Sequence, residues 1–156
     1  MSGDRSAADT AAALRLWVIL NRAVNSIGEV LGDQVSGHDL SYTEFAVLEV
    51  LLHKGALPIG EVGDQVLLTS GSMTYVIDKL EDRGLLHRRP CPDDRRVLYA
   101  ELTEAGRELI TEAFDEHANL LRELTVVLAE EEIQQASELI KRLGKRAEKY
   151  SAEIAS

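Results

Sequence analysis

The 156-residue sequence predicts a mainly α-helical fold with one small β-hairpin. Apolar residues make up 45% of the chain and aromatic residues only 4%, so Leu, Val, Ile and Ala dominate, a mixture that favours helices over stacked sheets. Apolar positions recur at helical spacing through most of the chain, and the spacing becomes that of strands only between residues 85 and 101. The length fits one domain, or a small domain with a dimerisation arm.

The first three predicted elements are helices. Thr10 is the expected N-cap of a long first helix, whose apolar residues follow helical spacing and which ends in a loop at Gly37. The sequence Ser41–Glu44 predicts a capping box at the start of a second helix, which Gly55 ends. Pro58 is tolerated in a first helical turn, so it predicts the opening of a short third helix.

A fourth helix and the hairpin follow. Residues 66–68 are the expected turn after the third helix, Thr69 is the expected cap of the fourth, and Gly84 ends it. Residues 85–89 and 97–101 predict two strands joined by a turn rich in Pro and Asp. The positions predicted to be buried in the second, third and fourth helices are Phe45, Leu48, Leu51, Leu52, Val62, Val66, Met73, Val76, Ile77 and Leu80.

Two long helices complete the chain. Thr103 is the expected cap of a fifth helix that runs to about Val127, and residues 130–150 predict a sixth. Two consecutive helices followed by a basic hairpin are the outline of a winged helix-turn-helix. The first, fifth and sixth helices are left with apolar stripes, and a second copy of the chain is the simplest partner for them.

These elements give a winged helix-turn-helix with long dimerisation helices, arranged as one intertwined domain. We expect an N-terminal dimerisation helix in residues 1–36 and the DNA-binding lobe in residues 40–102. Residues 103–156 are expected to form the C-terminal dimerisation helices.

The charge distribution matters more for function than the total. A net charge of −10 taken alone argues against nucleic-acid binding. Residues 79–96, however, contain six basic and four acidic side chains, a net +2, so the rest of the chain carries −12. The basic residues are therefore concentrated near the predicted fourth helix and hairpin, where DNA would be bound.

The N-terminal turns of the fourth helix carry the candidate base-contacting residues. Short polar side chains near a helix N-terminus can reach base edges and phosphates in the major groove. Lys79 and Arg83, further along, can hold backbone phosphates. A capped loop without function is the alternative interpretation of this Ser-rich sequence. The base-contacting candidates are Ser70, Ser72, Thr74 and Tyr75.

Four arginines flank the turn of the hairpin. Guanidinium groups at a hairpin tip suit insertion into a narrow minor groove, and Asp94 can hold an arginine there by a bidentate pair. The alternative is a solvated, charged turn. The four candidates are Arg88, Arg89, Arg95 and Arg96.

At these positions the sequence resembles the MarR family of bacterial regulators. The Asp-Arg-Arg of the hairpin, followed by Leu-Thr-x-x-Gly, is a specific signature, and the flanking helices match in length and position. The matching segments are Leu40–Glu44, Leu67–Ser72, Ile77–Leu86, Asp94–Arg96 and Leu102–Gly106.

The resemblance implies a homodimeric DNA-binding regulator, expected to be a repressor, that binds a near-palindromic operator. It implies release by a small, often phenolic, ligand or by oxidation of a cysteine. By position, Arg96 would enter the minor groove, and Arg95 would support it or bind phosphate. Residues 68–80 resemble the branch of the family that responds to quinones and related aromatic compounds.

Four further residues are candidates for sensing. Trp17 can line a ligand pocket between the dimerisation helices and the DNA-binding lobe, or it can be part of the dimer core; His38 and Tyr42 can face the same cavity. Cys91, the single cysteine, lies among arginines that would stabilise a reactive thiolate, although an incidental exposed cysteine is the alternative.

The sequence also excludes several classes of function. It contains no catalytic motif, no cofactor-binding loop and no histidine spacing typical of a metal site, so we expect neither an enzyme nor a cofactor. No segment is apolar enough for a membrane span or a signal peptide, which predicts a cytoplasmic protein. A winged-helix module that binds another protein instead of DNA is the remaining alternative, supported by the net acidity.

Overall fold

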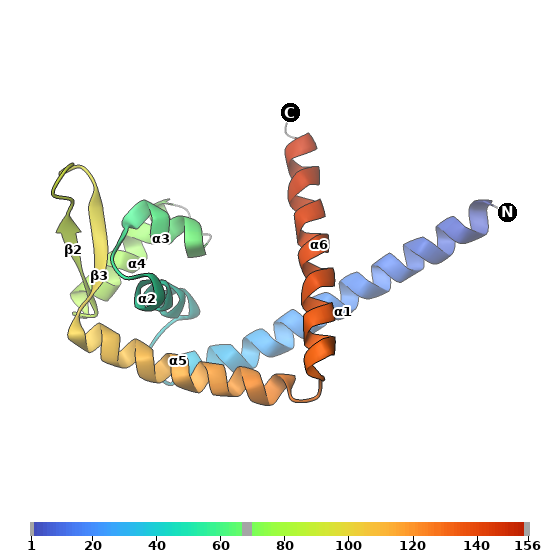
Figure 1. Ribbon diagram of the computed structural model, residues 1–156, viewed down its shortest axis with the longest axis horizontal. Helices are drawn as coiled ribbons and strands as arrows, with labels where there is room; N and C mark the ends of the chain where they lie inside the picture. Colours follow the sequence, from blue (N-terminus) through green and yellow to red (C-terminus); the bar gives the residue numbers. More distant parts are fainter. Residues whose placement is uncertain (1, 67–69, 155–156) are drawn as a thin grey trace. The chain divides into compact units, whose positions relative to one another are not determined.

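A computed structural model describes residues 2–66 and 70–154 (Figure 1). The chain divides into two compact units, one ending at Ala118 and the other beginning at Asn119. The elements, in chain order, are α1 (Ser2–Ser36), α2 (Tyr42–Lys54), β1 (Leu57–Pro58), α3 (Ile59–Val66), α4 (Ser70–Asp82), β2 (Leu86–Pro90), β3 (Leu98–Leu102), α5 (Glu104–Thr125) and α6 (Glu130–Ile154).

The three strands form one small antiparallel sheet in the order β1-β3-β2. In the hairpin, Leu86 pairs with Leu102 and Pro90 with Leu98, so each strand begins one residue later than predicted. The prediction that Pro58 opens a helix was wrong, because Leu57 and Pro58 pair with β3 and α3 begins only at Ile59. Pro58 is accommodated because β1 is an edge strand, where a residue without an N–H can be tolerated.

The hydrophobic core of the first unit lies between α2, α3, α4, the sheet and the start of α5. Phe45, Val62 and Ile77 are at most 1% exposed, and they come from three different helices. All the predicted core positions of α2 and α4 are buried except Leu52, which, like Val66 of α3, packs at the edge of the core. The core is completed by Val35, Leu40, Val47, Leu85, Leu86, Ala100, Leu102, Ile110 and Ala113.

The helix boundaries confirm the predicted capping signals after α1. The Ser41 hydroxyl accepts a hydrogen bond from the Glu44 amide at 3.2 Å, and the Glu44 carboxylate accepts one from the Ser41 amide at 2.6 Å, as a capping box requires. Gly84, with a φ of 70°, follows α4 in a conformation that favours glycine. Thr103 caps α5 by accepting from the Gly106 amide at 3.0 Å. Val66, expected in the turn after the third helix, is instead the last residue of α3, and the remaining turn residues 67–68 and the expected Thr69 cap lie outside the described residues.

The long helices differ from the predicted ones at their ends. Thr10 was wrongly predicted to cap α1, because that helix already begins at Ser2 and Thr10 lies within it. Helix α5 ends at Thr125, slightly earlier than predicted, and α6 continues past Tyr150 to Ile154. Both α1 and α6 keep large apolar side chains exposed, among them Leu14, Trp17, Ile19, Val24, Ile27, Leu139, Ile140, Leu143 and Ile154.

Candidate nucleic-acid interface

Helix α4 buries one face and presents the other to solvent. Met73, Ile77 and Leu80 are at most 2% exposed and anchor the helix in the core. Thr74 and Tyr75 lie on the outer face, as does Ser72, and the Tyr75 side chain is 69% exposed. Ser70 begins α4, but its side chain lies outside what the structure describes. The exposed face is therefore the polar one that recognition of DNA requires.

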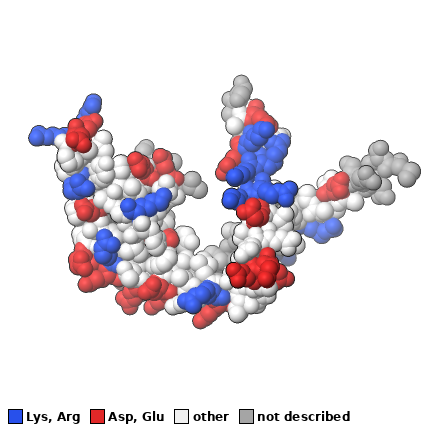
Figure 2. Space-filling model, viewed as in Figure 1, with Lys and Arg blue, Asp and Glu red and all other residues white. Residues whose placement is uncertain are grey.

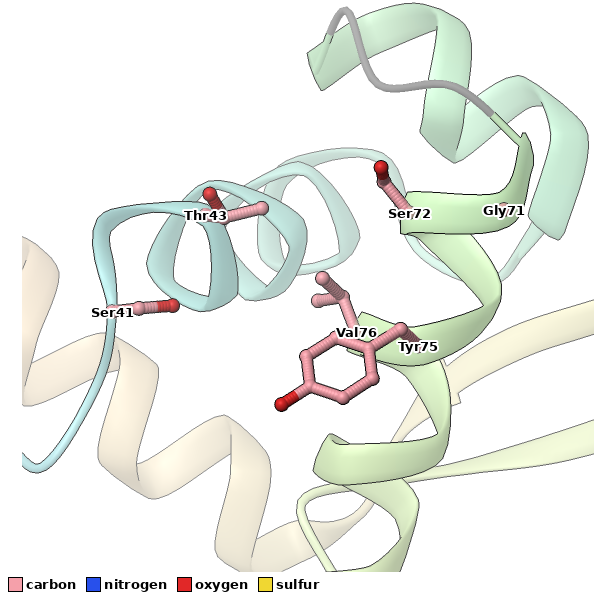
Figure 3. Close-up of a pocket in the computed structure, with 6 residues that line it drawn as sticks. All are labelled: Ser41, Thr43, Gly71, Ser72, Tyr75 and Val76. Carbon is pink, nitrogen blue, oxygen red and sulfur yellow. The ribbon is translucent and has the colours of Figure 1, made fainter.

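An open hollow of about 520 Å³ separates the N-terminal turns of α2 and α4. Figure 3 shows the hydroxyls of Thr43 and Ser72 at the upper side of this hollow, Val76 between the helices, and the Tyr75 ring below. Ser41 lines it from the residue that caps α2. Hydroxyl groups beside two helix N-termini suit the oxygens of a phosphate, so the hollow can receive the backbone of a nucleic acid.

Lys79 and Arg83 both pair with a buried carboxylate of the lobe. The Lys79 Nζ lies 3.0 Å from Glu44 Oε1, and the Arg83 guanidinium lies 3.6 Å from the same oxygen. Burial raises the pKa of Glu44, but hydrogen bonds from the Ser41 backbone and from Lys79 outweigh it, so the pKa lies below its ordinary value. Both cations, predicted as phosphate ligands, thus neutralise a carboxylate that is 2% exposed.

Arg88 also has a partner within the protein. Its guanidinium pairs with the carboxylates of Asp78 and Glu81 on α4, and its backbone amide donates to Glu81 Oε1 at 2.9 Å. The side chain is only 23% exposed. Arg88 therefore fastens strand β2 to α4, a role that the sequence pattern did not indicate.

The wing, which is the β2–β3 hairpin of residues 86–102, carries its most exposed basic side chain at its tip. Figure 2 shows basic side chains projecting from this tip. The side chain of Arg96 is 91% exposed, and its Nε and backbone amide both donate to Asp94 Oδ1, at 3.1 and 3.0 Å. The hydrogen bond from the Arg96 side chain, followed by that from its backbone, lowers the pKa of Asp94. The predicted carboxylate support of a tip arginine is confirmed, and Arg95 is exposed beside it.

Closer to the base of the wing, the charged groups are paired. The Arg89 Nε lies 3.0 Å from Glu101 Oε2, and its guanidinium carbon lies 5.3 Å from the centre of the Tyr99 ring. Cys91 is partly exposed, and its backbone amide donates to the Val97 carbonyl at 2.9 Å across the turn. The thiol therefore stands within the loop that presents the tip arginines.

The candidate ligand residues do not form a single cluster within the chain. Trp17 is 63% exposed on α1 and precedes Ser36, the last residue of that helix, by a helical rise of about 28 Å. His38 follows that end of the helix, with its Nε2 2.7 Å from Glu116 Oε2. Trp17 and His38 therefore lie too far apart to line one small cavity of a single chain.

Sequence reasoning missed a buried cluster next to His38. His117 is 6% exposed, its Nδ1 lies 3.1 Å from Gln34 Oε1, and its ring centre lies 4.7 Å from that of Phe45. The ring of Tyr42, another predicted ligand residue, lies 6.2 Å from that of His117. The spacing of His117 after Ile110 and Ala113 on the inner face of α5 was the available signal.

A buried helix pair with an outward polar face, joined to an arginine-tipped hairpin, defines a winged helix-turn-helix protein of the DNA-binding class. The chain belongs to the MarR family: residues 40–98 match the family, and the flanking regions match its individual members. It is a transcription regulator and not an enzyme.

Three known proteins illustrate this relationship. The chain is 45% identical over 141 residues to the HTH-type transcriptional regulator MhqR of Bacillus subtilis (strain 168), covering 90% of this chain and 97% of that protein. The fold matches a mutant of MarR from E. coli in complex with operator DNA, with a TM-score of 0.71, 23% identity and coverage of 81% and 94%. It also matches NadR in complex with 4-hydroxyphenylacetate, with a TM-score of 0.70, 21% identity and coverage of 82% and 91%.

Two further findings concern the described residues alone. Among residues 2–66 and 70–154, no three His, Cys, Asp or Glu side chains come together as a metal site would require. None of the helices described has the length and apolar character needed to cross a membrane.

Proposed function

We propose that the protein represses transcription in the cytoplasm by binding a near-palindromic operator as a homodimer, and that a small aromatic or phenolic ligand releases it. The observation that carries the proposal is the pairing of an exposed polar face on α4 with an arginine-tipped wing on the same lobe. In this arrangement the helix can enter a major groove while the wing reaches the adjacent minor groove.

The roles of the candidate side chains differ. Ser70, Ser72, Thr74 and Tyr75 contact bases and phosphates from α4, and Arg96, supported by Asp94, enters the minor groove. Arg95 binds phosphate beside it. Because Lys79, Arg83, Arg88 and Arg89 have carboxylate partners within the protein, they contribute to DNA binding mainly by holding α4 and the wing in place.

The proposed dimer uses residues 1–36 and 103–156, the predicted dimerisation helices. Its support is the row of exposed Leu, Ile, Val and Trp side chains on α1 and the similar row on α6, which water solvates poorly. Covering both rows with a second copy gives an extensive apolar interface of the kind found in obligate dimers. Sedimentation at micromolar concentration should therefore yield the mass of a dimer, whereas a monomer would refute this part.

The ligand proposal rests on the family and on the aromatic side chains at hand. Trp17 and Tyr42 are exposed, the Tyr42 ring lies 6.2 Å from that of His117, and His38 pairs with Glu116. A planar phenolic compound would stack on such rings and donate a hydrogen bond to a polar group. If it favours the state that does not bind DNA by about 1–3 kcal/mol, it lowers operator affinity by roughly 5- to 150-fold.

The test is binding to duplexes from the region upstream of the gene itself. Ser72→Glu should abolish specific binding and leave the circular dichroism spectrum unchanged, because a carboxylate there meets phosphates and base acceptors. Arg107, exposed in the first turn of α5, offers a matched control: Arg107→Ala should bind as the wild type does. Wild-type affinity in Ser72→Glu would remove α4 from recognition, and no specific binding by the wild type would refute the function.

A further inference from the structure

The least expected group in the DNA-binding lobe is the buried carboxylate of Glu44. It is 2% exposed, yet it lies only one residue from Thr43, which lines the hollow between α2 and α4. One of its oxygens accepts from the Ser41 amide at 2.6 Å, and the other is 3.0 Å from Lys79 Nζ. A carboxylate in such a place is tolerated only while its partners remain, so its contacts constrain the elements that supply them.

Two segments that are distant in sequence meet at this carboxylate. Glu44 belongs to the first turn of α2, Lys79 to the last turn of α4, and Arg83 directly follows that helix. Arg83 continues the connection, because its guanidinium donates to the Asp39 carbonyl at 2.9 Å in the loop that follows α1. Asp39 has a φ of 56°, a backbone conformation that few residues other than glycine adopt.

The same two helices form the hollow in Figure 3. Ser41 and Thr43 line it from the start of α2, and Ser72 and Tyr75 line it from the start of α4. The contacts of Glu44 to α4 therefore fix the separation of these two rows of hydroxyls. If the hollow receives a phosphate, this separation sets where the DNA backbone lies relative to the base-contacting face of α4.

We propose that Glu44 is a positioning residue for operator recognition: its carboxylate holds α4 in register with α2 and keeps Lys79 and Arg83 away from phosphates. This inference rests on the proposed DNA-binding face. It goes further because it makes Glu44, which does not contact DNA, responsible for part of the preference for the operator over other DNA sequences. Without the carboxylate, α4 loses its fixed position, and the two cations become available for contacts that carry no sequence information.

The test compares Glu44→Gln with a control that removes the same charge from α4. Asp82, the last residue of α4, is exposed, so Asp82→Asn changes the net charge equally without disturbing the buried contacts. For each protein, dissociation constants are measured for an operator duplex and a scrambled duplex across a salt series. Glu44→Gln should lower the ratio of specific to non-specific affinity about tenfold, within the range of coupling in charge networks. Asp82→Asn should leave this ratio within about twofold of the wild type.

The non-specific binding provides the second readout. In Glu44→Gln the log–log salt slope for the scrambled duplex should steepen by about 1–2, because Lys79 and Arg83 gain phosphate partners. If Glu44→Gln does not fold, Arg83→Gln, which leaves the Lys79–Glu44 pair in place, should lower the specificity ratio with little change in non-specific affinity.

Three outcomes would overturn the inference. An unchanged ratio in folded Glu44→Gln contradicts it directly. Equal loss of specific and non-specific affinity in Arg83→Gln would make Arg83 a phosphate ligand instead. A wild type that does not discriminate between the duplexes would refute the proposed function itself, which distinguishes that failure from the first two.

Discussion

Gly106 is a position where the fold leaves no room for a side chain. It lies in the first turn of α5, against the backbone of Leu85, which directly precedes the wing. A Cβ added at Gly106 would lie 1.8 Å from the Leu85 carbonyl oxygen and 2.7 Å from its carbonyl carbon. In Gly106→Ala the first turn of α5 must therefore move by roughly 1.2 Å before that contact reaches the 3.0 Å lower limit of real Cβ contacts.

This movement would break the hydrogen bonds that join α5 to the loop before β2. The Thr103 amide donates to the Leu85 carbonyl at 3.1 Å, and the Thr103 hydroxyl donates to the Gly84 carbonyl at 2.6 Å. Overpacking costs about 1–3 kcal/mol, and each lost hydrogen bond adds about 1 kcal/mol. We therefore expect Gly106→Ala to lower the free energy of unfolding by about 4 kcal/mol.

Urea unfolding followed by circular dichroism, at one fixed protein concentration, measures this change. With a slope of about 2 kcal/mol per molar, the midpoint should fall by about 2 M. Gly60 is a matched control in the first turn of α3, where nothing lies within 4 Å of an added Cβ. Gly60→Ala should be neutral or stabilising by up to about 1 kcal/mol. A midpoint for Gly106→Ala within about 0.5 M of the wild type would refute the packing argument.

Three other predictions concern pH, the wing and the cysteine. Burial lowers the pKa of His117, so below about pH 6.5 the unfolded chain binds a proton more readily than the folded one. As the pH is lowered below that value, the free energy of unfolding should therefore decrease, by at most about 1.4 kcal/mol per pH unit. His117→Gln should remove this contribution, and an identical pH profile in the variant would disprove it. Arg96→Ala should weaken operator binding and reduce the log–log salt slope by about 1, whereas an unchanged slope and affinity would mean that the wing does not touch DNA. Treatment with a benzoquinone should release DNA from the wild type but not from Cys91→Ser, because an adduct there obstructs the tip of the wing; equal responses would exclude Cys91 as the sensor.

The order and type of the helices could be predicted from sequence because their signals are local. The capping box at Ser41, the glycine after α4 and the apolar spacing of α4 each depend on residues within a few positions of one another. Pro58 was misassigned because its surroundings are not local. Whether Leu57 and Pro58 form a helical turn or a strand depends on the free edge of β3, some forty residues later, with which they pair.

In the candidate site, too, the features set by local sequence could be predicted, and those that depend on distant partners could not. Exposure of Tyr75 and of the tip arginine Arg96 follows from helical periodicity and from the turn, and both were predicted correctly as outward-facing groups. The partners of Lys79 and Arg88 could not be predicted, because a basic residue in sequence looks the same whether it faces a phosphate or a carboxylate. Glu44 was noted only as half of a capping box, although its second oxygen contacts α4.

The attachment of Arg88 to Asp78 and Glu81 has a consequence for changing the DNA sequence that this protein recognises. Helix α4 consists of an N-terminal half with exposed polar side chains and a C-terminal half whose carboxylates hold the base of the wing. Substitutions for retargeting should therefore be confined to residues 70–75 without the buried Met73, and the carboxylates of Asp78 and Glu81 should be kept. If a whole α4 helix from a relative replaced this one without a matching arginine in β2, the new base-contacting side chains would be present. The ion pairs that hold β2 against α4 would be lost, and the wing would no longer be fixed relative to the helix.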